Sequence, residues 1–285
     1  PINRLSIGIQ SFFDDDLKSM NRAHNASESK TCLEYASKHF DNITIDLIYG
    51  IPNMSLEKWN NNLDMTLSFG VNHISSYALT VESKTALDTF IKKGAYPPID
   101  EELALQHFNA MVSKVSAHGF IHYEISNFGK PDYFSKHNTS YWQGKSYLGI
   151  GPSAHSFFGN QRSWNISNNT KYIQAIQKEE LPRTVELLSK QDQFNEYVMT
   201  GLRTIWGVSF ESVEHNFGLA FLNHLKESSK KYNNDNLLVI ESKTTQSVQF
   251  DKMTLSQTPN NDEILKVTQK GKFLVDGIAA ELFMI

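Results

Sequence analysis

Three short stretches near the start of the chain are expected to be strands, and in the first two apolar residues alternate with small or polar residues. These stretches are RLSIGIQSF, NITIDLIYGIP and HISSYALT. Apolar residues at helical spacing follow each stretch, over residues 14–39, 55–70 and 100–118, with Ser55 able to cap the second helix and Gly70 able to end it. Alternation of strands and helices at this spacing predicts an α/β fold of parallel strands joined by right-handed crossovers.

The first two strands divide their side chains between a polar face and an apolar face. Ser6, Gly8 and Gln10 share one face of the first strand, and Thr44 and Asp46 share one face of the second. The opposite faces carry leucine and isoleucine, as in a sheet covered by helices. A polar face on such a sheet indicates a barrel with a functional lumen.

The pattern changes after residue 120. Two strand-like runs, FIHYEISNF and YLGIGPSAHSFFG, flank a loop-rich stretch that contains HNTSYW. From about residue 185 the chain is expected to be helical, and two more helices, the strand NLLVIES, a hairpin and a final helix then suggest a winged-helix module. The polar segment at 243–262 would be an insertion in its wing.

Composition limits the class of protein. The 285 residues are 40% hydrophobic and carry a net charge of −4, which is typical of a globular chain and calls for neither nucleic acid nor an anionic membrane as partner. No apolar run is long enough to span a bilayer. The single cysteine, Cys32, excludes an internal disulfide and fits a cytoplasmic location. One thiolate cannot hold an iron–sulfur cluster, which takes about three or four.

Three polar residues in the first part of the chain each allow two interpretations. Asp46 within an apolar strand is either a satisfied buried carboxylate or a ligand contact inside the barrel. Gln10 either ties the strand to a loop or offers a donor and an acceptor to a ligand. Arg22 in MNRAH forms either a surface ion pair or a fork that grips a carboxylate.

Two later motifs also carry candidate chemistry. HNTSYW gathers His137, Asn138, Tyr141 and Trp142, which on their own favour an ordinary loop but would also suit haem, with imidazole on iron and rings on the porphyrin. In GIGPSAHS, small residues allow the backbone to approach a ligand, and His155 beside them can face the same cavity.

Taken together, the motifs resemble the radical S-adenosylmethionine (SAM) proteins related to oxygen-independent coproporphyrinogen III oxidase. The resemblance rests on NRLSIGIQSF…MNRAH, NITIDLIYGIP, HISSYALT, YEISNF, HNTSYW and YLGIGPSAHS, in that order and spacing. HNTSYW looks like the HNxxYW signature of the HemW-type haem chaperones, where the true oxidases differ. The family fold is a partial barrel of about six strands and helices followed by a C-terminal domain.

The resemblance implies specific ligand contacts. It assigns SAM contacts to Gln10, Arg22, Asp46, Ala78 and His155. It assigns haem binding to His137 within the signature completed by Asn138, Tyr141 and Trp142. The family's three-cysteine loop, its Gly-Gly-Thr-Pro stretch and its ribose-binding Glu have no counterpart here, so the chain resembles the C-terminal portion of a longer protein.

The resemblance also sets the expected organisation. Residues 1–119 would form the last three strand–helix units of a partial radical SAM barrel, with an open edge at the first strand where self-association is possible. Residues 120–184 would form an α+β connecting region with the HNxxYW loop, and residues 185–285 a helical, winged-helix-like C-terminal domain.

The expected function follows from the same resemblance. The full-length protein would use SAM and a [4Fe–4S] cluster, and would act as a haem chaperone whose haem acceptor is left open. The alternative is a coproporphyrinogen III oxidase, which decarboxylates its porphyrinogen substrate to protoporphyrinogen IX. This chain alone, without cluster ligands, is expected to hold no metal, no catalytic residue and no bound cofactor, and to be inactive.

Overall fold

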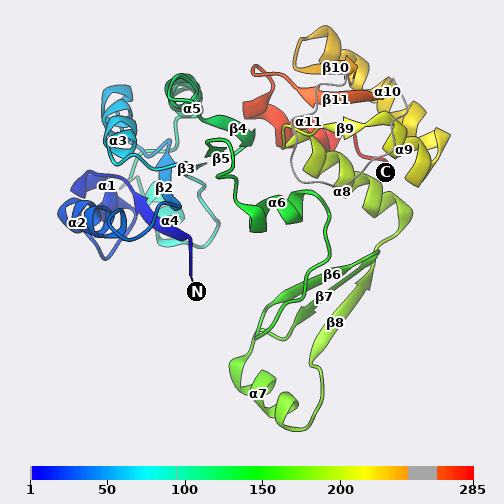
Figure 1. Ribbon diagram of the computed structural model, residues 1–285, viewed down its shortest axis with the longest axis horizontal. Helices are drawn as coiled ribbons and strands as arrows, with labels where there is room; N and C mark the ends of the chain where they lie inside the picture. The colour runs from blue at the N-terminus through cyan, green and yellow to red at the C-terminus, as the bar shows by residue number, and fades with distance from the viewer. Residues whose placement is uncertain (1, 95, 243–261) are drawn as a thin grey trace. The chain divides into compact units, whose positions relative to one another are not determined.

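The computed structural model describes residues 2–94, 96–242 and 262–285, and the chain divides into two compact units (Figure 1). The first unit is Pro1–Ser135 and the second is Lys136–Ile285. The predicted boundary at residue 119 therefore falls inside the first unit, and the one at 184 falls inside the second. Apart from Asp262, the predicted wing insertion lies outside the described residues.

The first unit is built on a five-stranded sheet in the order β1-β2-β3-β5-β4. The strands β1 (Leu5–Gln10), β2 (Ile43–Tyr49) and β3 (His73–Ala78) are parallel, as predicted. The hairpin of β4 (Ile121–Glu124) and β5 (Asn127–Gly129) joins the same sheet, because β5 pairs antiparallel with β3. The first unit thus extends beyond the three expected strand–helix units, and β1 lies at an edge of its sheet.

Helices follow the strands of the first unit where the sequence places caps. The predicted helical region 14–39 is two helices, because Asn25 forms a capping box with Glu28 and starts a new helix. Ser55 accepts a hydrogen bond from the Lys58 backbone and begins the third, as predicted. The helices are α1 (Asp14–Ser19), α2 (Ala26–Ala36), α3 (Leu56–Ser68), α4 (Ala86–Lys92) and α5 (Glu101–Ala117).

The apolar face of this sheet forms the core of the first unit. Ile45 and Leu47 of β2 are fully buried, as is Trp59 of α3. The Trp59 indole donates a hydrogen bond of 2.8 Å to the backbone carbonyl of His107 in α5, so α3 is fixed to α5. Burying each of these large apolar side chains contributes about 1.5–3 kcal/mol, which holds the opposite, polar face in place.

The second unit begins with a short helix and an antiparallel sheet. HNTSYW was predicted to lie in a loop, but it forms α6 (Lys136–Trp142), because the segment contains no glycine or proline until Gly144, at φ +64°, follows the helix. The sheet has the order β6-β7-β8. Its strands are β6 (His155–Phe158), β7 (Gln161–Asn165) and β8 (Arg183–Leu187), with α7 (Asn169–Gln177) between the last two.

The rest of the second unit has the predicted winged-helix topology. The helical part begins at α8 (Lys190–Leu202), not near 185, because β8 occupies that stretch and Ser189 forms a capping box with Asp192. A second three-stranded sheet has the order β10-β11-β9. The remaining elements are β9 (Val208–Ser209), α9 (Phe210–Phe217), α10 (Leu219–Asn234), β10 (Leu238–Ser242), β11 (Glu263–Val267), the 3₁₀ turn η1 (Lys272–Leu274) and α11 (Val275–Glu281).

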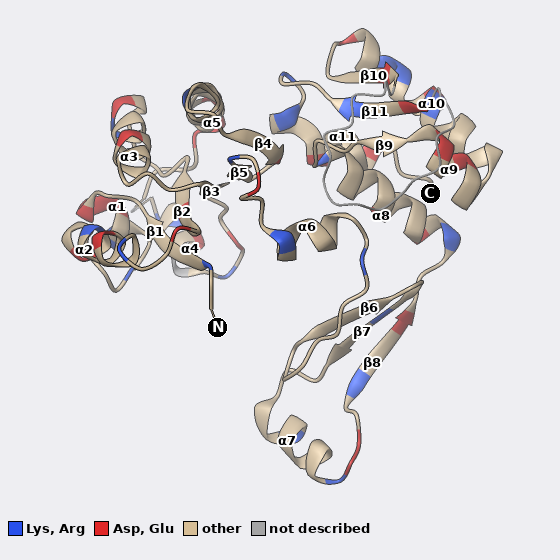
Figure 2. Cartoon of the chain, in the orientation of Figure 1, with Lys and Arg blue, Asp and Glu red and all other residues tan. Residues whose placement is uncertain are grey.

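Charge does not single out one element of either unit. Acidic and basic side chains are interspersed along the helices and strands (Figure 2), and the chain carries 27 Lys and Arg against 31 Asp and Glu. Among the described helices, none combines the length and the apolar character that crossing a bilayer requires.

Candidate functional site

The polar face of the first unit brings Asp46 together with serines from both neighbouring strands. Gly8, Asp46 and Ser75 occupy paired positions across β1, β2 and β3. The Ser6 hydroxyl lies 3.3 Å from each carboxylate oxygen of Asp46 and donates to them. Burial raises the pKa of Asp46, while hydrogen bonds from Ser6 and Ser75 and the charge of Arg4 act against that rise. Asp46 is therefore a half-buried carboxylate on the face that the alternation predicts.

The side chain of Gln10 lies on the same face because the backbone of β1 is irregular there. A bulge interrupts the pairing of β1 between Gly8 and Gln10, and Gln10 has a left-handed backbone at φ +66°. A side-chain carbon on Gly8 would lie only 2.7 Å from the amide nitrogen of Gln10. The absence of a side chain at position 8 thus leaves room for the Gln10 amide beside the Asp46 row.

A buried polar network, which the sequence did not reveal, extends this face. Ser75 donates to Asn127 at 2.8 Å, and Asn127 donates to the Glu124 carboxylate at 2.5 Å. His73 Nε2 lies 2.7 Å from the Tyr123 hydroxyl. Burial, together with the charge of Arg4, lowers the pKa of His73 to about 3, and burial raises the pKa of Tyr123 to about 12. Both groups are therefore neutral at physiological pH.

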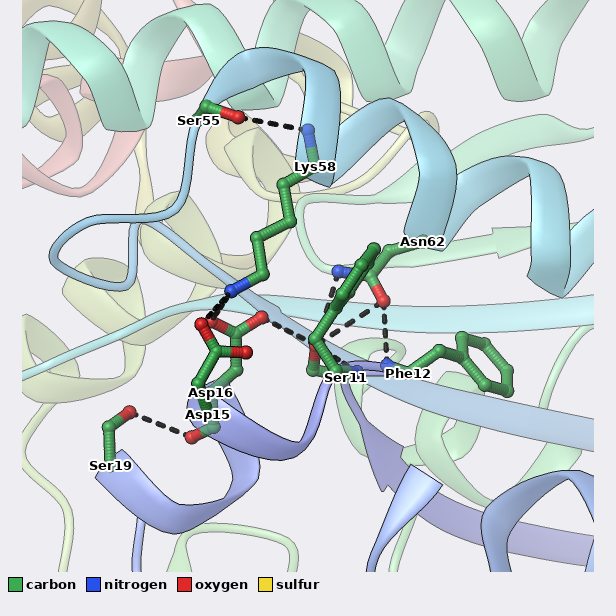
Figure 3. Close-up of polar contacts among 9 residues, drawn as sticks. Ser11, Phe12, Asp15, Asp16, Ser19, Ser55, Lys58 and Asn62 are labelled. Carbon is green, nitrogen blue, oxygen red and sulfur yellow. Dashed lines mark hydrogen bonds and ion pairs between the residues drawn. The ribbon is translucent and has the colours of Figure 1, made fainter. Parts of the chain in front are cut away.

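A second buried network, also absent from the sequence interpretation, fixes the turn after β1 (Figure 3). Asn62 of α3 accepts a 2.7 Å hydrogen bond from the Phe12 backbone and contacts the Ser11 hydroxyl. Ser11 also donates to Asp16 at 2.6 Å. Lys58 of α3 reaches Asp16 at 2.6 Å, so the carboxyl end of β1 is attached to α3 by hydrogen bonds and an ion pair.

The two remaining predicted residues of the first unit lie at exposed positions. Ala78 ends β3 and pairs with Tyr49 of β2. Arg22 follows α1, and its backbone amide donates to Leu17 at 2.9 Å. Its guanidinium makes no ion pair with the residues that the structure describes. Gln10 and Ala78 are thus at the carboxyl ends of parallel strands, where α/β sheets commonly bind ligands.

The residues of this chain do not fit an iron–sulfur cluster. The only cysteine in the sequence, Cys32, is exposed on α2. Over residues 2–94, 96–242 and 262–285, no group of three or more His, Cys, Asp or Glu side chains could hold a metal ion. A [4Fe–4S] cluster takes about three or four thiolates, which a single cysteine cannot supply.

Helix α6 divides the HNTSYW residues into two pairs, each one turn apart. His137 is exposed and meets the Tyr141 ring edge-on, with ring centroids 4.7 Å apart at 86°. Asn138 and Trp142 form the other pair, and the Arg203 guanidinium lies 5.3 Å from the centre of the half-buried Trp142 ring. The His137 ring makes no hydrogen bond within the described part of the chain. Its nitrogens are therefore open to a ligand.

His155 belongs to the second unit, whereas the other four predicted SAM contacts belong to the first. It is exposed at the start of β6 and stacks on Trp164 of β7, with ring centroids 6.0 Å apart at 28°. His155 and Trp164 also line a cavity of about 630 Å³ with Arg183 and Thr184 of β8. His155 and the other four residues thus belong to different units.

Known proteins with similar sequences carry names that agree with one another. Residues 188–245 match the HemN C-terminal domain. The chain is 35% identical over 221 residues to the heme chaperone HemW of Bacillus subtilis, covering 76% of this chain and 58% of the relative. It is 34% identical to the mouse protein named radical S-adenosyl methionine domain-containing protein 1, mitochondrial, covering 74% of this chain and 50% of the relative.

The fold also has a solved counterpart. The coproporphyrinogen III oxidase HemN from Escherichia coli, a radical SAM enzyme, matches 99% of this chain and 64% of its own with a TM-score of 0.74. At 19% identity this likeness shows the fold alone. The chain spans about half the length of the curated relatives it matches, from 46% of a Mycobacterium tuberculosis protein to 58% of the Bacillus protein. By its sequence relatives and its fold, the chain belongs to the family of the HemW-type and HemN-type radical SAM proteins.

Proposed function

We propose that this chain binds haem as part of a HemW-type haem chaperone, with the imidazole of His137 on the iron. One observation carries the proposal: His137 is exposed on α6, its ring edge is packed by Tyr141 at 4.7 Å, and its nitrogens have no partner among the described residues. A neutral imidazole is a common axial ligand of haem iron. The relatives named heme chaperone support the same ligand.

We further propose that the polar face of the first unit contacts SAM. Asp46 offers a half-buried carboxylate to the amino group or the ribose hydroxyls, and the Gln10 amide offers both a donor and an acceptor. Ala78 and Arg22 would complete the site from the strand end and the turn after α1. Bound to a cluster, SAM supplies a radical; this chain holds no cluster ligands, and its own residues only bind and orient.

The test of the haem proposal is a titration with ferric haem followed by absorbance in the Soret band. The wild-type protein is expected to give a saturable shift, and His137→Ala to bind at least about tenfold more weakly, with a different Soret position, because an axial ligand is lost. His215→Ala is the matched control, since His215 is exposed on helix α9 of the same unit. An identical titration for His137→Ala and wild type would overturn the assignment.

Coproporphyrinogen oxidation is the competing function, and it is tested with the full-length protein because this chain has a single cysteine. The full-length protein would be incubated with coproporphyrinogen III under reducing, oxygen-free conditions, and the products separated. Protoporphyrinogen IX as product would establish an oxidase. Because the likeness to the Escherichia coli oxidase is one of fold, the chaperone remains the function that His137 and the relatives support.

A further inference from the structure

The second unit contains an open groove with a volume of about 1440 Å³. Pockets for drug-sized ligands measure roughly 300–1,000 Å³, so this groove suits a broad ligand. Its walls are rich in aromatic side chains. They include Tyr141, Trp142, Tyr147, Phe157, Tyr197 and Trp206.

Three rings line up from α6 into this groove, and we call them the aromatic ladder: Tyr141, Tyr147 and Phe157. Tyr141 meets His137 edge-on at 4.7 Å and meets Tyr147 edge-on at 4.6 Å. Tyr147 and Phe157 then stack, with ring centroids 6.1 Å apart at 29°. The ladder thus connects the exposed imidazole to the wall of the groove without a break.

Backbone pairing holds the two inner rings on one face. The amide of Tyr147 donates to the carbonyl of Phe157, and the amide of Phe157 donates to the carbonyl of Tyr147, both at 2.9 Å. Directly opposed residues of antiparallel strands point their side chains to the same side. The rings therefore keep their place without a ligand, which lowers the entropy that binding would cost.

The cation beside the ladder is paired with carboxylates. Arg162 sits opposite Phe157 on β7 and forms ion pairs with Glu196 of α8 and, at 3.8 Å, with Glu186 of β8. Burial raises the pKa of the Tyr147 phenol, so this ring is neutral at physiological pH. Arg162 is thus already paired with two carboxylates. A ligand that lies against the ladder would therefore meet aromatic ring faces and apolar surface, and not the unpaired charge of Arg162.

We propose that the aromatic ladder is a stacking platform for the flat face of a tetrapyrrole, so that the groove recognises the porphyrin ring whether or not it carries a metal. This inference rests on the proposed haem-binding function and extends it from the iron ligand to the macrocycle. Stacked and edge-on contacts with neutral rings act on any porphyrin, whereas imidazole acts only on the metal. The chain would then bind metal-free porphyrins in the same groove.

The experiment uses metal-free protoporphyrin IX, titrated into the protein and followed by quenching of aromatic fluorescence. Phe157→Leu combined with Tyr147→Leu is expected to weaken binding at least about tenfold, since two aromatic contacts are lost. Phe158→Leu is the matched control, because Phe158 is the neighbouring residue of β6, is 76% exposed and points to the opposite face of the strand. Tyr147→Phe keeps the ring and is expected to bind as wild type does.

A parallel titration with haem separates this inference from the proposed function. His137→Ala should alter the Soret position and leave binding of metal-free protoporphyrin IX within about threefold of wild type, since the ladder is the metal-independent part. The double variant should weaken haem binding and keep the Soret position.

Three outcomes would each decide whether the ladder binds the porphyrin ring. Haem binding that depends on His137, with no binding of the metal-free porphyrin, would overturn the platform and leave the haem proposal standing. Equal losses for Phe158→Leu and the double variant, each folded by circular dichroism, would mean non-specific adhesion and would also overturn the platform. Metal-free binding through the ladder, with no effect of His137→Ala on haem, would support the platform and overturn the iron ligand.

Discussion

The polar face of the first unit and the aromatic ladder of the second hold their side chains in place in opposite ways. On the polar face, neighbours such as His73 and Ser75 are buried, at 0% and 5% exposure, and are held by hydrogen bonds. On the ladder, Tyr141 is 39% exposed and is held by ring contacts. A buried polar group needs its partner, whereas an exposed ring does not. We therefore expect substitutions to cost stability in the first region and affinity in the second.

The largest contrast is expected from one cation in each unit. Lys58 contacts Asp15 and the 3% exposed Asp16 at 2.6 Å, so Lys58→Met leaves a buried carboxylate without its ammonium group. This should lower the free energy of unfolding by about 2–4 kcal/mol, the lower part of the range applying because Ser11 still donates to Asp16. Arg162→Met removes a more exposed ion pair and should cost less than about 1 kcal/mol.

The measurement is urea denaturation at pH 7, with hydrogen exchange assigning the loss to each unit. Arg162 is the matched partner because it too is a cation shared by two carboxylates, Glu186 and Glu196. Equal losses for Lys58→Met and Arg162→Met would break the comparison, since burial would then not be what separates the two regions.

The network around Lys58 marks what the sequence could not provide. The spacing of apolar residues and the Ser55 cap predict α3, and alternation predicts that Ser6 and Asp46 share a face. No periodicity signals that Asn62, a polar residue in a helix, is fully buried against Ser11 and Phe12. Periodicity reports the burial of apolar side chains, whereas polar pairing between distant segments depends on the tertiary structure.

Irregular backbone limits the sequence interpretation in the same way. Strict alternation places Gln10 on the polar face, and the structure brings its amide there through a bulge with φ +66°, which alternation does not predict. The residues of HNTSYW were recognised by their types, but their helix was missed because seven residues are too few for a clear periodic signal. Their division into two pairs, His137 with Tyr141 and Asn138 with Trp142, followed only from that helix.

The stability of the first unit is expected to depend on pH through His73. The pKa of His73 falls to about 3 in the folded protein because of burial, and its Nδ1 has no partner among the described residues, so a second ring proton would be unsatisfied there. The unfolded chain, with an ordinary histidine pKa near 6.5, binds this proton first. Stability is therefore complete above about pH 6.5 and is lost as pH falls toward 3, by at most about 1.4 kcal/mol per pH unit.

The test compares the pH dependence of unfolding for three proteins. His73→Gln keeps a polar side chain for the Tyr123 hydroxyl and removes the titration, so its stability should fall less steeply than that of wild type between pH 6.5 and 4. His118→Gln is the control, because His118 is exposed in the same unit. A slope that His73→Gln leaves unchanged would show that the buried imidazole does not govern acid unfolding of the first unit.

The smallest expected effect sharpens the comparison most, because it separates stability from ligand binding on the polar face itself. The raised pKa of Asp46 means that the folded protein holds its proton more tightly than the unfolded chain, so the ionised form costs stability at neutral pH. Asp46→Asn should raise the free energy of unfolding at pH 7 by less than about 1 kcal/mol, since the carboxylate is only half-buried and already accepts from Ser6. As pH falls through the pKa of Asp46, the carboxyl becomes neutral and the gain in stability of Asp46→Asn over wild type should disappear.

In the full-length protein, Asp46→Asn should weaken SAM binding measured by calorimetry. A variant that is less stable at pH 7 would mean that Asp46 holds the fold together, as the buried groups around His73 do, and is not kept there for a ligand.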